Sequence, residues 1–392
     1  MGGENREGTN MDKENVKISV VREGYKSLAK EAREASHGGR VMLFTEEGIV
    51  GDDAAAALTF EGMAVTRRNI PEKGADDLFA ELQKPPEGIM AAVAVGGIAP
   101  IEAAKAARLP SAIPKILFPT ESAALSAADD RVYLSTKGAL PVGRSFGQVT
   151  LLDPAVLSAS SLRPALGYIA ATLLEEADDA YEKLLTERVS PAISLRTIKE
   201  KAALLADIRE ENAAEDAVNA ALTLLNSSHS APQAGSAHTL ALLGAKKEAG
   251  LFPDYLFPAS YAIILLYEGY LGSLPLEHCP PPDRAENLRL LHARCRMEPS
   301  LLSPAQKPFS RCYEERWRLT AEYREDFLEA IRAIPLRHLS RLYRRAAEDR
   351  SPALTANELL MLLSLTGEAV SGYPLIKHIK MTGLIEPLLK CG

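Results

Sequence analysis

Two kinds of hydrophobic pattern follow each other along this chain, and the change falls near residue 155. In the first part, short apolar runs alternate with segments of helical periodicity, which is typical of parallel strands joined by helices. Strands are predicted at 16–21, 41–44, 63–66, 90–95 and 112–118, and helices at 25–35, 52–58, 75–82 and 101–107. The pattern therefore predicts an α/β domain with a doubly wound parallel sheet over residues 16–154.

A hairpin-like region closes this first part, with strands at 131–135 and 148–152 on either side of a Lys137-Gly138 turn. From residue 155 onward, the apolar residues recur at helical spacing. Helices are predicted at 155–160, 164–187, 194–207, 211–226, 236–248, 257–271, 284–296, 311–332, 337–348 and 355–365. Residues 155–392 are expected to form an all-α domain, and the mostly polar residues 1–15 a disordered tail.

One junction between a strand and a helix carries the most informative local signal. The strand at 90–95 leads into Gly96 and Gly97, and a helix follows. Free N–H groups and the helix dipole at such a junction suit a phosphate group, and glycine permits its close approach. Ile98 stands where a third glycine would be expected, so a tight turn without any ligand fits the same residues.

The overall composition narrows the classes of function. The 392 residues carry a net charge of −7, and no nucleic-acid partner is expected. No apolar run is long enough to cross a bilayer, so no membrane partner is expected either. The four cysteines form no C-x-x-C pair, which indicates neither a redox motif nor a zinc knuckle and suits a reducing cytoplasm. Residues 281–350 are rich in arginine with acids interleaved, and they fit either solvated helix faces or an anion-binding surface.

Several short motifs occur in an order that resembles one known superfamily. After Gly96-Gly97 come Lys105, Pro119-Thr120-Glu121-Ser122, the run 149–154, Arg163-Pro164-Ala165-Leu166-Gly167 and Ala234-Gly235-Ser236-Ala237-His238. This order resembles the iron-containing alcohol dehydrogenases, glycerol dehydrogenases and dehydroquinate synthases. The last motif looks like that of the sn-glycerol-1-phosphate dehydrogenase branch. The resemblance implies a dehydroquinate synthase-like fold, in which the active site lies in the cleft between an α/β dinucleotide-binding domain and a helical domain.

The resemblance also implies where an NAD(P) cofactor would bind. The implied cofactor-binding residues are Gly96, Gly97, Pro119, Thr120 and Ser122. The two glycines would face the pyrophosphate, and the other three would lie near the nicotinamide. Two residues depart from the family pattern, because Glu102 stands where an Asp is usual and Glu121 where a small hydroxyl residue is common. A carboxylate at position 121 would repel a phosphate if it points toward the loop.

Members of this superfamily usually bind Zn²⁺ or Fe²⁺ through one Asp and two His, and the metal polarises the substrate oxygen. By this resemblance only one of the three ligand positions keeps a donor, which is His238. Ala170 and Phe257 stand at the other two positions, and neither side chain can coordinate a metal. The implied zinc or iron site is therefore degenerate.

Two other interpretations of these residues stay open. A metal site rebuilt from His229, His238 and either Asp178 or Asp179 is one of them. The other is that His238 is a hydrogen-bonded structural residue, which is the usual role of a histidine without ligand partners.

Three hypotheses about function follow. The first is a pseudoenzyme of the glycerol-1-phosphate dehydrogenase-like group, which has lost standard metal-dependent catalysis and keeps nucleotide or phosphorylated-ligand binding in the cleft. The second is an active NAD(P)-dependent oxidoreductase that acts on a small polyol or glycerol phosphate through a rearranged metal site. The third is an obligate oligomeric scaffold. The resemblance favours a cytoplasmic homo-oligomer with a small phosphorylated or polyol ligand.

Overall fold

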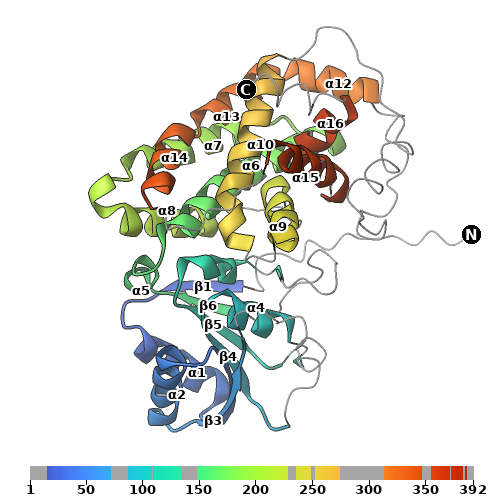
Figure 1. The fold of residues 1–392 in the computed structure, drawn as a ribbon. Helices are drawn as coiled ribbons and strands as arrows, with labels where there is room; N and C mark the ends of the chain where they lie inside the picture. The colour runs from blue at the N-terminus through green and yellow to red at the C-terminus, as the bar shows by residue number, and fades with distance from the viewer. Residues whose placement is uncertain are drawn as a thin grey trace, which may run out of the picture. The chain divides into compact units, whose positions relative to one another are not determined.

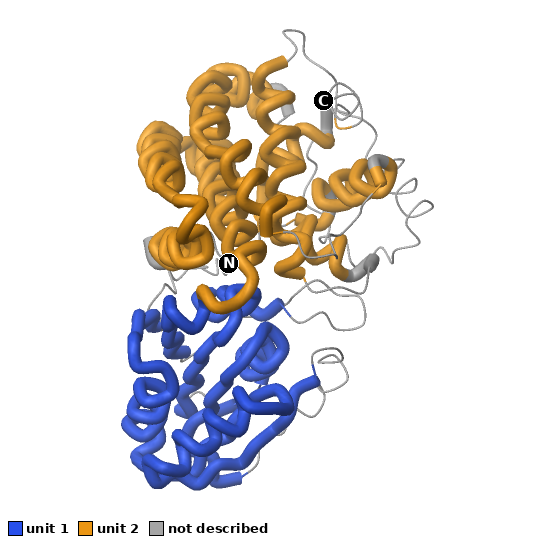
Figure 2. Tube along the Cα trace, turned by 60° about the vertical axis from the view of Figure 1, so that its left-hand side comes forward, with its two compact units in different colours: residues 1–134, 141–157 blue, residues 135–140, 158–392 orange. Residues whose placement is uncertain are grey.

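The computed structural model describes most of the chain, in two compact units (Figures 1 and 2). The described residues are 16–71, 87–107, 109–110, 112–129, 131–133, 148–227, 235–248, 252–273, 313–346, 355–370, 372–382 and 385. Unit 1 comprises residues 1–134 and 141–157, and unit 2 comprises residues 135–140 and 158–392.

A six-stranded sheet forms the centre of unit 1, and all of its neighbouring strands are parallel. Its strands are β1 (Val16–Val20), β2 (Arg40–Thr45), β3 (Ala64–Asn69), β4 (Ala91–Gly96), β5 (Lys115–Pro119) and β6 (Gln148–Leu152). The order across the sheet is β1-β6-β5-β4-β2-β3. This arrangement confirms the predicted α/β class with a parallel sheet.

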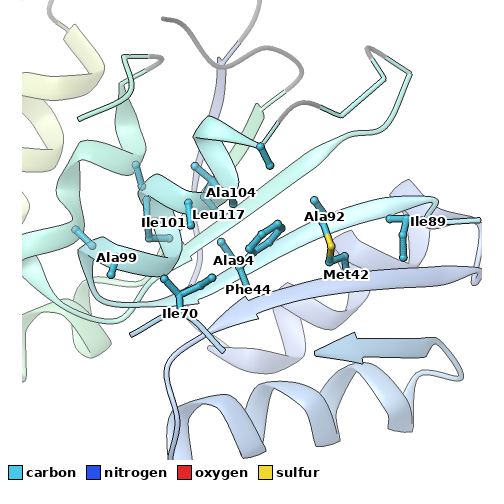
Figure 3. Close-up of a cluster of buried hydrophobic side chains, with 14 residues drawn as sticks. Met42, Phe44, Ile70, Ile89, Ala92, Ala94, Ala99, Ile101, Ala104 and Leu117 are labelled. Atoms are coloured by element: carbon cyan, nitrogen blue, oxygen red, sulfur yellow. The ribbon is translucent and has the colours of Figure 1, made fainter. Parts of the chain in front are cut away.

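Helices cover both faces of this sheet because the central strands are apolar on both sides. Side chains alternate between the faces, so Val41 and Leu43 of β2 pack with α1 (Tyr25–Ser36) and α2 (Ile49–Phe60). Met42 and Phe44 belong to the opposite cluster, with α4 (Ile98–Ala106) and the short helix η2 (Ser122–Ala128) (Figure 3). The sheet is therefore doubly wound, as its strand pattern predicted.

Two predictions for unit 1 were wrong in detail. The expected hairpin is absent from the described residues, because β6 pairs in parallel with β1 and β5. Of the expected strand at 131–135, residues 131–133 are described, and only Arg131 forms an isolated bridge. Helix α4 begins at Ile98, three residues before the predicted start, so the glycines lie directly at its N-terminus. The helix predicted at 75–82 lies outside the described residues.

Helices make up unit 2, and a short helix α5 (Pro154–Ser158) precedes it. Its longer helices are α6 (Leu162–Thr186), α7 (Ala192–Leu204), α8 (Ala213–Ser227), α9 (Ser236–Glu248), α10 (Phe252–Gly272), α12 (Tyr313–Glu322), α13 (Arg324–Ala333), α14 (Leu336–Arg345), α15 (Ala356–Ala369) and α16 (Leu375–Thr382). Two short helices, η3 (Leu205–Asp207) and η4 (Glu210–Asn212), link α7 to α8. None of the described helices is long and apolar enough to span a membrane.

Most helix predictions for unit 2 are confirmed, with three corrections. The helix predicted at 311–332 is two helices, which are separated at Tyr323. Helix α10 begins five residues earlier than predicted and continues through Pro258. The short helix α16 was not predicted at all. The helix predicted at 284–296 lies outside the described residues.

The long helix α6 is the central element of unit 2. It packs against α7, α8, α9 and α10, and most of its residues are buried. Gly167 allows a close approach to α10, since a Cβ there would lie 3.0 Å from the backbone nitrogen of Phe257. The backbones of α6 and α10 are therefore in near contact at the level of the predicted metal site.

Candidate functional site

The predicted cofactor residues of unit 1 lie together at the carboxyl edge of the sheet. Gly96 at the end of β4 is the register partner of Pro119 at the end of β5, and the Thr120 N–H donates to the Gly96 carbonyl at 3.0 Å. Gly96 has a φ of +133°, a conformation that favours glycine. Gly97 is the N-cap residue of α4, and Ser122 is fully buried at the start of η2. In open parallel sheets, ligands bind at this edge.

Two carboxylates lie against the glycine at the helix start. A Cβ on Gly97 would be 2.9 Å from Glu46 Oε1 and 3.1 Å from Glu121 Oε2. Glu46 follows β2 and Glu121 follows β5, so the two strands on either side of β4 bring both acids to the glycine at its end. The N-terminus of α4 would attract an anion, but this position already faces two negative side chains of the chain itself.

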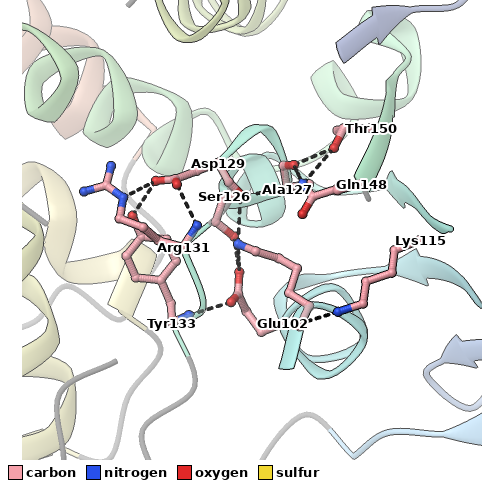
Figure 4. A network of polar contacts seen from close by, with 10 residues as sticks. Glu102, Lys115, Ser126, Ala127, Asp129, Arg131, Tyr133, Gln148 and Thr150 are labelled. Atoms are coloured by element: carbon pink, nitrogen blue, oxygen red, sulfur yellow. Dashed lines mark hydrogen bonds and ion pairs between the residues drawn. The ribbon is translucent and has the colours of Figure 1, made fainter. Parts of the chain in front are cut away.

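The Glu102 carboxylate has a different role from that of a ligand-binding acid. It is 1% exposed and accepts hydrogen bonds from Lys105 Nζ at 2.9 Å, from Ser126 Oγ at 2.7 Å and from the Tyr133 N–H at 2.6 Å (Figure 4). Lys105 is itself buried and also donates to the Ser126 carbonyl at 3.0 Å. A glutamate at this position therefore ties α4 to η2 and to the segment that follows it.

The same buried network continues toward the beginning of β5 and the end of η2 (Figure 4). Burial raises the pKa of Asp129, but Arg131 and Lys105 outweigh this effect and hold the pKa well below its ordinary value. Lys115 donates to the Lys105 carbonyl at 2.9 Å, and burial together with the charge of Lys105 lowers the pKa of Lys115 to about 8. The network holds α4, and with it the glycine loop, in a fixed position on the sheet.

In unit 2, His238 is bound by a carboxylate of the neighbouring helix. Its Nδ1 contacts Glu175 Oε1, and both side chains are buried. Glu175 Oε1 also accepts the Gly235 N–H at 2.9 Å. A side chain at position 235 would overlap Glu175, so the glycine of this motif is what allows the carboxylate to approach. The rings of Tyr168 and Phe252 pack near the imidazole, at centroid distances of 6.3 and 6.2 Å.

A second carboxylate on α6 joins three further helices. Asp178 accepts hydrogen bonds from Ser236 Oγ at 2.5 Å, from the Ser236 N–H at 3.2 Å and from the Tyr267 hydroxyl at 2.7 Å. The Tyr267 hydroxyl in turn accepts the Ile376 N–H of α16 at 3.0 Å. Burial raises the pKa of Asp178 to about 6, although these hydrogen bonds act in the opposite direction. Glu175 and Asp178 thus place negative charge at the N-terminus of α9, where the helix dipole favours it.

The other two predicted ligand positions hold side chains that serve packing. Ala170 is fully buried on α6. Phe257 on α10 stacks on Tyr343 of α14 at a centroid distance of 4.4 Å. The guanidinium of Arg163 also lies 4.4 Å from the centre of the Tyr343 ring. No group of three potential metal ligands occurs among the described residues. The donor set around His238 therefore does not fit the zinc or iron that the resemblance implies.

The rebuilt metal site considered from the sequence gains no support. Asp178 is engaged with Ser236 and Tyr267, and Asp179 forms an ion pair with Lys183 at 2.8 Å. His229 lies outside the described residues, as do all four cysteines. His238 has instead the contacts of a structural histidine.

The sequence did not reveal three of the residues that shape these two regions, which are Glu46, Glu175 and Tyr267. Asp178 was considered only as a metal ligand, whereas it binds Ser236 and Tyr267. Glu175 and Asp178 are three residues apart on an otherwise apolar helix, and such buried acids signal partners. Glu46 directly follows a buried strand, and acids at that place in dinucleotide-binding folds approach the ligand.

No protein-family model matches the sequence, and no curated protein matches it. Solved structures are similar over nearly the whole chain. An archaeal halo-thermophilic alcohol dehydrogenase from a Red Sea brine pool shares 14% identity, with 96% of each chain covered and a TM-score of 0.56. An iron-containing alcohol dehydrogenase from Thermotoga maritima shares 13% identity, with 95% of this chain and 98% of that chain covered and a TM-score of 0.55. Glycerol dehydrogenase from Schizosaccharomyces pombe shares 14% identity, with 96% of this chain and 90% of that chain covered and a TM-score of 0.52. At such low identity this likeness establishes the fold, and the chain therefore has the dehydroquinate synthase-like fold of the iron-containing alcohol dehydrogenase and glycerol dehydrogenase superfamily.

Proposed function

We propose that this chain is a dehydrogenase-fold protein of the glycerol-1-phosphate dehydrogenase-like group that has lost metal-dependent hydride transfer. The observation that carries the proposal is the chemistry of three positions. A catalytic zinc site needs at least three protein donors, but Ala170 and Phe257 provide none, and His238 is bound to Glu175. Phe257, which stands at the place of a metal ligand, is moreover stacked on Tyr343 and is thus part of the helical core.

The carboxyl edge of the sheet supports the same proposal. A pyrophosphate at the N-terminus of α4 would approach the carboxylates of Glu46 and Glu121, which already lie near Gly97. Like charges at such a short range repel, and solvent screens part of this repulsion because Glu121 is exposed. The strand ends and the glycines are kept, whereas the electrostatics no longer favour a phosphorylated cofactor.

The nucleotide that fits this edge best is one without a 2′-phosphate on its ribose, such as NAD. A carboxylate after the second strand of such a sheet can accept hydrogen bonds from ribose hydroxyls, and it repels the 2′-phosphate of NADP. Glu46 stands at that place. We therefore propose weak nucleotide binding that is limited by Glu121.

Calorimetric titration of the full chain with NAD⁺, NADP⁺ and ADP-ribose tests this proposal. We expect weak or undetectable binding by the wild-type chain, and binding that is about tenfold tighter in Glu121→Gln, because one like charge is removed. Glu87→Gln changes an exposed acid that precedes β4, at the opposite edge of the sheet, and serves as the matched control. Micromolar binding of NADP⁺ by the wild-type chain would contradict the proposal.

The alternative function is an active NAD(P)-dependent oxidoreductase for a small polyol or glycerol phosphate. It is favoured by the fold and by the carboxylate–imidazole pair of Glu175 and His238, a pairing that also occurs at catalytic histidines. Nicotinamide-linked turnover of glycerol, glycerol phosphate or a small diol that disappears in His238→Ala would establish this alternative.

A further inference from the structure

Arg67 of β3 has each nitrogen of its guanidinium group on a different acceptor. Nη2 donates to the Glu46 carbonyl at 3.0 Å, Nε donates to Asn69 Oδ1 at 2.7 Å, and Nη1 forms an ion pair with Asp52 on α2. A planar guanidinium holds such a set of acceptors in a fixed geometry, which a lysine ammonium cannot do. Arg67 therefore joins β3, α2 and the turn that lies between β2 and α2.

Residues 46–48 form the turn from β2 to α2, and Arg67 holds the first of them. The hydrogen-bond ladder of the sheet reaches Thr45, whose carbonyl accepts the N–H of the residue after β3 at 2.7 Å. Helix α2 begins directly after Gly48, which has a φ of +121° and no side chain that could cap the helix. The bond from Arg67 to the Glu46 carbonyl thus extends the support of the sheet into this turn.

Gly51 makes room for this guanidinium. It is buried in the first turn of α2, where a Cβ would overlap Arg67 Nη2 and would lie 2.7 Å from the Glu46 carbonyl oxygen. A side chain at position 51 would therefore displace either the guanidinium or the turn. Glycine lowers the stability of a helix, and the close approach of Arg67 explains its presence at this position.

Arg67 acts on Glu46 from the opposite face of the sheet. It is the register partner of Leu43, whose side chain packs on the face that α1 and α2 cover. The Glu46 carboxylate lies at the start of α4, which covers the other face, and its Oε1 would be 2.9 Å from a Cβ on Gly97. The backbone of Glu46 is thus held on one side of the sheet, while its side chain is presented on the other.

We propose that Arg67 is a positioning residue for nucleotide selection, which acts by fixing the carboxylate of Glu46. This role rests on the proposed function, in which that carboxylate accepts hydrogen bonds from the ribose of NAD and repels the 2′-phosphate of NADP. Both effects depend on where the carboxylate lies, so a turn that is no longer held would discriminate less between the two nucleotides. Direct binding of the 2′-phosphate by Arg67 fits less well, since each of its nitrogens already donates to an acceptor of this chain.

Calorimetric titration of the full chain with NAD⁺ and NADP⁺, in the Glu121→Gln background, measures this selectivity. With Arg67 present, we expect the dissociation constant of NADP⁺ to exceed that of NAD⁺ by about tenfold or more. Arg67→Met should lower this ratio to about threefold or less. Arg67→Lys should lower it as well, because an ammonium keeps the charge without the planar set of donors. Arg33→Met breaks an exposed ion pair with Glu61 and, as the matched control, should leave the ratio unchanged.

Hydrogen exchange of peptides that span residues 45–52 gives a second measurement, which needs no nucleotide. Exchange should be faster in Arg67→Met and in Gly51→Ala, which displaces the guanidinium without removing its charge, than in Arg33→Met. A ratio that stays unchanged or rises in Arg67→Met, or full rescue by Arg67→Lys, would overturn the positioning role and leave the proposed function intact. A Glu121→Gln chain that binds neither nucleotide would instead overturn the proposed function and with it the role in selection, and equal exchange rates would show in addition that Arg67 does not hold the turn.

Discussion

Glu175 and His238 lie 63 residues apart in the sequence, yet the carboxylate of one is bound to the imidazole of the other. Glu175 comes five residues after Ala170, where the resemblance places an acidic metal ligand. The acid of this helix thus contacts the histidine directly, without a third donor beside it in the described residues. The motif that suggested a metal ligand acts here as the anchor of α9 on α6.

Gly235→Ala tests this anchor. The added Cβ would overlap Glu175, which must then move away from His238 and from the start of α9. We expect a loss of about 1–3 kcal/mol in the free energy of unfolding, the usual range for overpacking a filled site. Urea denaturation measures it. The control is Gly272→Ala, because a Cβ there would meet only Arg332, at 3.8 Å, and equal effects of both changes would argue against the anchor.

Asp178 should give the protein a stability that falls as the pH rises. Its pKa is about 6 in the folded state and 3.8 in the absence of burial, so the folded chain binds more protons between these values. The free energy of unfolding should therefore decrease from pH 4 to pH 6, with a slope of at most about 1.4 kcal/mol per pH unit from this group. Asp178→Asn should remove that slope. An unchanged pH profile of the variant would show that Asp178 is not the group responsible.

His378 should act in the opposite direction. Burial, helped by the charge of Arg316, lowers its pKa to about 3, so the folded state holds the neutral ring while the unfolded chain becomes protonated below about pH 6.5. Stability from this group is complete above pH 6.5 and is lost as the pH falls toward 3. His378→Leu should therefore resist acid unfolding better than the wild-type chain, as tryptophan fluorescence during acid titration can follow. Acid midpoints that coincide would refute this assignment.

The buried pair of Lys105 and Glu102 should contribute far more than an exposed pair. Lys105→Met leaves the Glu102 charge without its cation inside unit 1, which should cost about 3–5 kcal/mol of unfolding free energy. Arg33→Met breaks the exposed contact with Glu61 and should cost about 0–1 kcal/mol. Thermal or urea unfolding of the two variants in parallel decides the matter, and comparable losses would contradict the structural role of the network.

The hydrophobic periodicity of the sequence predicted the fold class correctly, because each residue's burial determines whether that position is apolar or polar. Strands such as β2 and β4 are apolar on both faces, which only a sheet covered on both sides can bury. The same reasoning failed for β6, since the glycine near residue 138 suggested a local turn, whereas the partners of Gln148 are Val16 and Lys115. Pairing between strands far apart in the chain leaves no mark in local periodicity.

The candidate site was predicted in part. From the motif order we predicted that Gly96, Gly97, Pro119 and Thr120 lie together. The register of β4 and β5 places them at one edge of the sheet. Their role toward a cofactor stays a prediction. The contacts of Glu46 with Gly97 and of Glu175 with His238 depend on packing between distant segments, which a single sequence does not encode in any local pattern.

The metal content of the purified chain shows whether the site around His238 still binds zinc or iron. The full chain is incubated with Zn²⁺, or with Fe²⁺ in the absence of oxygen, then freed of unbound metal by gel filtration and measured by mass spectrometry of the elements. We expect no stoichiometric metal in the wild-type chain, and no difference between it and His238→Ala. One metal ion per chain that His238→Ala removes would contradict the loss of the metal site.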